Sequence, residues 1–162
     1  MNLTVLVLAA ITVTPLTTPT SGVNGDEHYY LPSQTASKVV TVTPNGSASA
    51  AFTVLTQAVA IKETGPQETV SRFGEVYSFS PSFLAVHRDE PTAVSFWNLQ
   101  PDDDHDFMLV DPDLNVLMMV KLPALEKTDF VFIFHREGLF NFYCTMHQPE
   151  MSGQILVLPP AH

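Results

Sequence analysis

Short apolar segments separated by turn-forming residues make up most of the chain after residue 75. Turns are signalled by Asp111-Pro112-Asp113 and by Glu137-Gly138, and strand alternation places Phe130, Phe132 and Phe134 on one face. Many short strands between turns of this kind favour an all-β sandwich or barrel. We expect strands over 76–79, 83–87, 93–99, 107–110, 116–122, 130–134, 139–144 and 155–158.

The chain before residue 63 is interpreted as an N-terminal extension of that β domain. Residues 14–37 are rich in Thr, Ser, Pro and Gly with little periodicity, which is typical of a linker. Apolar segments over 38–43 and 51–61 flank a turn signal at 44–47. The second segment is compatible with a strand or a short helix, and we take the pair as a β-hairpin. The predicted parts are therefore a signal peptide or anchor remnant (1–24), an extension with the hairpin (25–62) and the β domain (63–162).

The chain opens with an apolar run from Met1 to Val13. Its length suits the core of a signal peptide and is short for a membrane-spanning helix. An N-terminal strand is the alternative, because Val, Ile and Thr are abundant in the run. We expect an exported protein, periplasmic or extracellular, that meets a membrane only if this run is kept as an anchor.

Composition limits the classes of function. The chain has 162 residues, which suits one compact domain with some chain left over, and a formal net charge of −10. Without a basic patch it cannot release counterions from phosphates, so a nucleic-acid partner is excluded. The single cysteine, Cys144, cannot form an internal disulfide. Metal ligation would explain an unpaired cysteine in an exported protein.

Soft metal donors crowd the segment 140–153. Cys144 offers a thiolate, His147 an imidazole three residues later and Met151 a thioether four residues after that. Together they suit copper better than calcium or magnesium, which prefer oxygen ligands. His105 is the best candidate for a second imidazole, delivered from a neighbouring strand. It would complete a trigonal set with a weak axial methionine, the blue-copper arrangement.

Other interpretations exist for each donor taken alone. A buried cysteine or methionine is most often a core residue, and a single histidine is most often a satisfied polar group. That interpretation does not explain the spacing of the donors. Zinc is the main rival metal because it also binds Cys and His, but structural zinc prefers four such ligands and the fourth donor here is a thioether.

From about Phe73 to Pro159 the sequence resembles the cupredoxins, the type 1 blue copper proteins. The resemblance lies in three segments, of which the last is the most specific: 77–83, 105–107 and 142–153. It implies a Greek-key β-sandwich and one copper ion that alternates between Cu(I) and Cu(II). It also implies that both imidazoles bind through the ring nitrogen nearer the backbone. The implied ligands are His105, Cys144, His147 and, in the axial position, Met151.

Asp106 follows the first predicted ligand, where many cupredoxins carry asparagine. That asparagine commonly ties the two ligand loops together, and an ionised aspartate can accept such bonds but cannot donate them. The link between the loops is therefore an open point. Gly153 is expected to let the backbone turn into the last strand.

Aspartates gather around His105, at positions 102, 103, 104, 106, 111 and 113. A solvated loop is the ordinary interpretation of such a run. A docking patch for a basic redox partner is the alternative. In that case, neutralising residues 102–104 should slow electron exchange at low salt and leave the visible spectrum nearly intact.

The expected function is that of a soluble, monomeric one-electron carrier rather than an enzyme. Its redox partner would be a cytochrome, an oxidase or a reductase. The main alternative is a copper-handling protein of the cell envelope, a chaperone or store, against which the buried thiolate loop argues. A catalytic copper with an open position is disfavoured because Met151 fills the axial site. A cupredoxin-like fold without metal is disfavoured because all four donors are present.

Overall fold

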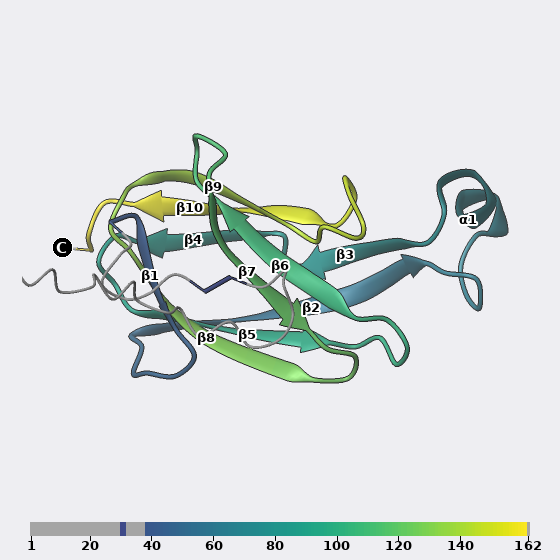
Figure 1. The fold of residues 1–162 in the computed structure, drawn as a ribbon, viewed down its shortest axis with the longest axis horizontal. Helices are drawn as coiled ribbons and strands as arrows, with labels where there is room; N and C mark the ends of the chain where they lie inside the picture. Colours follow the sequence, from purple (N-terminus) through teal and green to yellow (C-terminus); the bar gives the residue numbers. More distant parts are fainter. Residues whose placement is uncertain (1–29, 32–37, 162) are drawn as a thin grey trace, which may run out of the picture.

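The computed structural model describes residues 30–31 and 38–161, and these residues form two five-stranded sheets packed as a sandwich (Figure 1). One sheet has the order β1 (Val40–Thr43), β8 (Lys127–Phe134), β5 (Thr92–Asn98), β2 (Ala50–Ala60), β3 (Val76–Ser80). The other has the order β4 (Phe83–His87), β10 (Ser152–Leu158), β9 (Gly138–Tyr143), β6 (His105–Val110), β7 (Val116–Leu122). The predicted all-β sandwich is confirmed, and each of the eight strands expected after residue 75 is present.

The core lies between the two sheets and is rich in phenylalanine, with valine, leucine and methionine packed around the rings. Phe130, Phe132 and Phe134 are all buried, as strand alternation predicts. The Phe107 ring centroid lies 5.1 Å from that of Phe142 and 4.6 Å from that of Phe96, so one ring bridges both sheets. Each fully buried side chain of this size stabilises the fold by about 1.5–3 kcal/mol. A site at one end of the sandwich would therefore rest on this well-packed apolar core.

The predicted hairpin of the N-terminal extension is wrong. Both strands exist, but β1 pairs with β8, whereas β2 lies between β5 and β3. The turn signal at 44–47 is local and does not specify which strands pair. Val40, Val42 and Val54 are buried in the common core, and that burial draws both strands into the sandwich. The predicted signal peptide over 1–24 lies outside the described residues.

One short helix, α1 (Gln67–Phe73), has no counterpart in the sequence analysis. It connects β2 to β3 and stands beyond the end of the sandwich (Figure 1). None of its residues is buried, so it lacks the apolar stripe by which a helix is usually recognised. Within the described part of the chain, no helix has the length and apolar character needed to cross a membrane.

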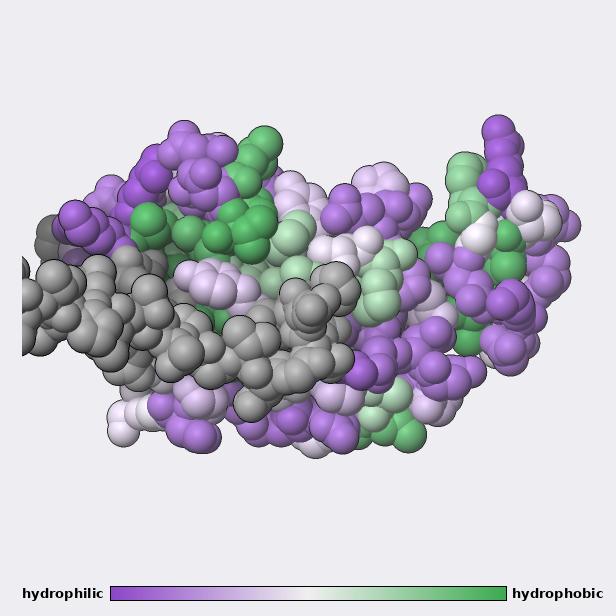
Figure 2. Space-filling view, in the orientation of Figure 1, coloured by the Kyte–Doolittle hydropathy of each residue, from purple (hydrophilic) through white to green (hydrophobic). Residues whose placement is uncertain are grey.

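On the face drawn in Figure 2, hydrophilic residues predominate and apolar residues form smaller patches. The exposed large hydrophobic side chains include Leu114, Val116 and Leu139. Leu114 and Val116 lie in and just after the β6–β7 turn, and Leu139 is near the start of the neighbouring β9, so these three residues gather at one end of their sheet.

Candidate metal centre

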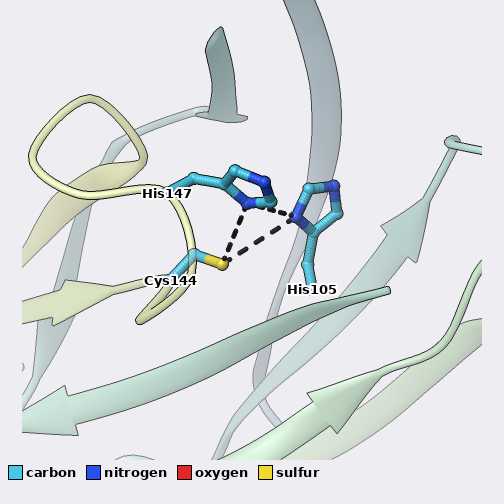
Figure 3. A group of neighbouring side chains, drawn as sticks. All are labelled: His105, Cys144 and His147. Atoms are coloured by element: carbon cyan, nitrogen blue, oxygen red, sulfur yellow. Dashed lines mark hydrogen bonds between the residues drawn. The ribbon is translucent and has the colours of Figure 1, made fainter. Parts of the chain in front are cut away.

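Three donor atoms converge at one end of the sandwich (Figure 3). Nδ1 of His105 lies 3.2 Å from Nδ1 of His147. Sγ of Cys144 lies 3.8 Å from Nδ1 of His105 and 3.6 Å from Nδ1 of His147. Nδ1 is the ring nitrogen nearer the backbone, so both imidazoles present the atom that the sequence resemblance implies.

Strand pairing explains why residues far apart in sequence meet here. β6 and β9 are antiparallel neighbours, with Met108 opposite Tyr143. The beginning of β6 therefore lies beside the end of β9. His105 is the first residue of β6, two residues earlier than the strand start we predicted, because it pairs with Leu122 of β7. Cys144 follows directly after β9 and, like His105, is fully buried.

The loop between β9 and β10 supplies His147 and Met151. The backbone N–H of Cys144 donates to the carbonyl of Met151 at 2.9 Å, and the N–H of Met151 donates to the carbonyl of His147 at 2.9 Å. These two bonds close the loop and hold its ends together. Met151 is fully buried, whereas His147 is half-buried. The four residues predicted as ligands thus lie on or beside one closed loop and one strand end, and the donor atoms of three of them, His105, Cys144 and His147, converge.

Asp106 links the two segments that carry the predicted ligands. One of its carboxylate oxygens accepts the backbone N–H of Thr145 at 2.7 Å, and the other accepts the Thr145 hydroxyl. Both groups on Thr145 are donors, so an acceptor-only carboxylate satisfies them. An aspartate can therefore link the two ligand-bearing segments, because both groups that it binds on Thr145 are hydrogen-bond donors. Asp106 is buried, whereas Thr145 is exposed, so the two bonds are partly shielded from water.

We expect Asp106→Ala to weaken both the fold and the site. Two donors on Thr145, held in part-buried bonds to a carboxylate, would lose their acceptor, which lowers the free energy of unfolding by about 2 kcal/mol. Loss of a residue that orients ligands typically lowers metal affinity about 10- to 100-fold. Urea unfolding of the metal-free protein and competition with a copper chelator measure the two effects. Asp106→Asn keeps an acceptor oxygen and should recover most of both, and an alanine variant with unchanged affinity would contradict this role.

Burial affects the protonation of His105 and Cys144 before any metal binds. It lowers the pKa of His105 to about 4, with a smaller contribution from nearby His147, so this imidazole is neutral at pH 7. Burial raises the pKa of the Cys144 thiol. A neutral imidazole is ready to bind a metal, whereas the thiol must first lose its proton to the solvent.

A tyrosine that sequence reasoning did not assign to the site lies against both histidines. The Tyr77 ring centroid is 4.9 Å from that of His105 and 4.5 Å from that of His147. Its hydroxyl donates to Asp103 at 2.5 Å, and burial is the main cause of its raised pKa. Tyr77 belongs to β3, in the other sheet, and no motif in the sequence indicates that it would reach the donors.

The acidic segment before His105 is held by hydrogen bonds rather than being a freely solvated loop. Buried Asn98 donates to the carbonyls of Asp103 at 2.7 Å and of Leu122 at 3.0 Å. Asp104 accepts a hydrogen bond from the backbone N–H of Ala124 and forms an ion pair with Lys121. The hydrogen bond from Lys121 is the main cause of the lowered pKa of Asp104. Among these aspartates, Asp102 is exposed and has no hydrogen bond or ion pair to the described residues.

The sequence cluster of aspartates is divided in space. Asp111 and Asp113 follow the last residue of β6, at the opposite end of that strand from His105. Asp111 accepts the backbone N–H groups of Asp113 and Asn115, and Asp113 accepts two bonds from Arg136. These two residues organise the β6–β7 turn and do not contribute charge beside the donors.

No protein-family model and no curated protein sequence matches this chain. Solved structures do match. The structure of auracyanin B aligns with a TM-score of 0.52 at 15% identity, over 76% of this chain and all of that one. A multicopper oxidase aligns with a TM-score of 0.52 at 14% identity, over 70% of this chain and 45% of the oxidase. The likeness shows that the chain has the cupredoxin fold, as the sequence resemblance implied.

Proposed function

We propose that this chain is a mononuclear copper protein that carries single electrons. The convergence of Nδ1 of His105, Nδ1 of His147 and Sγ of Cys144 within 3.8 Å of one another supports this most directly. Two imidazoles and one thiolate form the trigonal set that blue-copper sites use. Bound copper would supply a reversible one-electron couple between Cu(I) and Cu(II).

The protein's part in this function is to keep the donors still. Electron transfer is favoured when the ligands move little between the two oxidation states. His105 is fixed in a paired strand, and Cys144 is fixed by the backbone bond to Met151. Burial of His105, Cys144 and Met151 excludes water from three of the four proposed ligands. These constraints suit a carrier better than a site that must exchange its ligands.

The direct test is electrochemical. The copper-loaded protein should give a reversible one-electron wave with one copper per chain and should exchange electrons rapidly with a small cytochrome. A protein that passes its copper ion to a metal-free acceptor faster than it passes an electron would instead be a copper-handling protein. Turnover of a substrate under oxygen, with product formed in proportion to enzyme, would contradict the proposal that this is not an enzyme.

Met151 is proposed as the weak axial ligand, because its backbone is hydrogen-bonded to the backbones of Cys144 and His147 and its side chain is buried. We expect Met151→Leu to keep copper and to raise the reduction potential, since a lost thioether disfavours Cu(II) more than Cu(I). A rise of about 60 mV or more corresponds to a tenfold change in relative affinity for the two oxidation states.

Met151→Gln is the matched control for that prediction. An amide oxygen favours Cu(II), so the potential should fall rather than rise. Both potentials are measured by redox titration of the visible absorbance. A leucine variant that loses all its copper would mean that Met151 holds the metal rather than tuning it.

The partner is proposed to be a basic redox protein met outside the cytoplasm. The net charge of −10 would speed encounter with such a partner, and this steering fades with salt. Asp102 is the aspartate of the 102–104 segment that is exposed and without a described partner. Asp103 and Asp104 are already engaged within the protein.

Asp102→Asn is therefore the substitution that tests docking. It should slow electron exchange with a basic cytochrome by about twofold at low ionic strength, and by little at high salt, with an unchanged spectrum. The second-order rate across a salt series measures it. Asp103→Asn should also disturb the spectrum, because Asp103 binds the Tyr77 hydroxyl. Equal rates for wild type and Asp102→Asn at every salt concentration would assign the segment a purely structural role.

A further inference from the structure

Tyr77 approaches the donors from the sheet that carries none of them. β3 belongs to the β1-β8-β5-β2-β3 sheet, whereas His105 and Cys144 come from the facing sheet. The Tyr77 side chain is 1% exposed, and its ring meets the His105 ring edge-on at 65° and the His147 ring at a tilt of 54°. One buried ring therefore contacts both imidazoles at once.

The hydroxyl of Tyr77 fixes the position of that ring. It donates to a carboxylate oxygen of Asp103 at 2.5 Å. The main chain of Asp103 is itself held, because its carbonyl accepts the side-chain N–H of Asn98. Asn98 is in turn buried and accepts the hydroxyl hydrogen of Thr56 at 2.7 Å. A chain of hydrogen bonds thus runs from β2 and β5, through the acidic segment, to the phenol.

We propose that Tyr77 is a positioning residue for both histidines and that Asp103 anchors it. The ring limits rotation of the two imidazoles and closes the side of the site that faces the other sheet. The hydroxyl is needed because it joins this ring to the segment that leads into His105. The proposal rests on the proposed copper site, but the packing it describes exists without metal.

Tyr77→Leu tests the ring, with Phe79→Leu as the matched control. Phe79 lies on the same strand and is also buried, but it contacts Phe107 and Phe142 rather than a histidine. Both variants lose an aromatic ring from the core, so both lose stability. Any effect on the site beyond that shared loss therefore reports positioning.

The first measurement uses the metal-free protein. We expect the ring-proton NMR signals of both histidines to shift in Tyr77→Leu, because the neighbouring ring current is lost, and to broaden as the imidazoles gain freedom. The same signals should stay in place in Phe79→Leu. Unshifted signals in Tyr77→Leu, or equal shifts in the two variants, would overturn the proposal.

The second measurement uses copper. Competition with a chelator should show affinity about 10- to 100-fold lower in Tyr77→Leu and nearly unchanged in Phe79→Leu. If the wild-type protein bound no copper, the proposed function would fail, while the metal-free NMR comparison would still judge the role of Tyr77. Wild-type affinity retained in Tyr77→Leu would overturn the positioning role and leave the copper site standing.

Tyr77→Phe tests the hydrogen bond between the Tyr77 hydroxyl and Asp103. It also replaces Tyr77→Leu as the test if the leucine variant does not fold. It keeps the ring and removes only the bond to Asp103. We expect the histidine signals to shift less in Tyr77→Phe than in Tyr77→Leu. Asp103→Asn should shift the same signals by a similar amount, and combining Tyr77→Phe with Asp103→Asn should add no further shift. Coupled residues show such non-additive behaviour. Fully additive effects, or no effect in either single variant, would overturn the anchoring of Tyr77 by Asp103.

Discussion

Cys144→Ser is expected to abolish the intense visible absorption band of the copper-loaded protein. The band arises from charge transfer between a thiolate and Cu(II), and a serine hydroxyl neither ionises readily nor supports that transition. Cys144 is the only cysteine in the chain, so no other residue can supply the thiolate. The expected loss is complete rather than partial. Absorbance spectra of both proteins, loaded with equal amounts of copper, measure it.

The structure supplies the control for this substitution. Cys144 is fully buried, so the serine variant buries a hydroxyl in place of a thiol and should still fold with a loss of about 1–3 kcal/mol in stability. Far-ultraviolet circular dichroism of the metal-free variant checks that the sandwich is intact. A folded serine variant that retained the band would place the chromophore elsewhere and remove Cys144 from the site.

Gly153→Ala is expected to destabilise the protein by about 3 kcal/mol or more, at the upper end of overpacking effects. A Cβ atom at Gly153 would fall well inside van der Waals contact with the Phe142 ring and the Ser82 carbonyl oxygen. Gly153 and Phe142 are paired across β10 and β9, so neither backbone can move without disturbing the sheet. Urea unfolding of the metal-free protein measures the change.

Gly46→Ala is the matched control. Its Cβ would meet a methyl group of Val131 at 3.4 Å, which is close to ordinary contact. We expect its free energy of unfolding to change by about 0.5 kcal/mol or less. Equal effects at both positions would mean that the close approach at Gly153 relaxes at little cost.

The sequence analysis expected a glycine to be needed at position 153, but for a reason that differs from the one the structure shows. We expected this glycine to help the backbone turn into the last strand. It instead lies within β10, where the Phe142 ring and the Ser82 carbonyl leave no room for a side chain. A turn can be inferred from neighbouring residues, but a ring that packs from the adjacent strand cannot.

Much of the fold and the donor cluster could be predicted because both depend on short-range patterns. Alternation placed Phe130, Phe132 and Phe134 on one face, and all three are buried. His105 could be paired with the loop because a trigonal copper site needs a second imidazole. Local spacing and ligand chemistry were sufficient for these inferences.

What could not be predicted depends on contacts between distant segments. The strand order that separates β1 from β2 follows from which apolar faces meet in the core. The contact of Tyr77 with both histidines joins one sheet to the other. The bond from Asp106 to Thr145 depends on the pairing of β6 with β9. Because the sequence shows only neighbours along the chain, these relationships became visible only in the folded protein.

The structure also changes one expectation about the acidic segment. Neutralising residues 102–104 together was expected to leave the spectrum nearly intact. Asp103 binds Tyr77, which lies against both histidines, and Asp104 binds the backbone of Ala124. The triple substitution would therefore alter the site and the surface charge at once. The single substitution Asp102→Asn separates the two effects.

The visible and electron paramagnetic resonance spectra of the wild-type protein, loaded with one equivalent of Cu(II), test the central claim most directly. The proposed site requires an intense thiolate-to-copper band, together with the narrow copper hyperfine splitting of a covalent Cu(II)–thiolate bond. Both should disappear on reduction and return on reoxidation. A colourless adduct with the wide splitting of ordinary nitrogen and oxygen ligation would contradict copper binding by His105, Cys144 and His147.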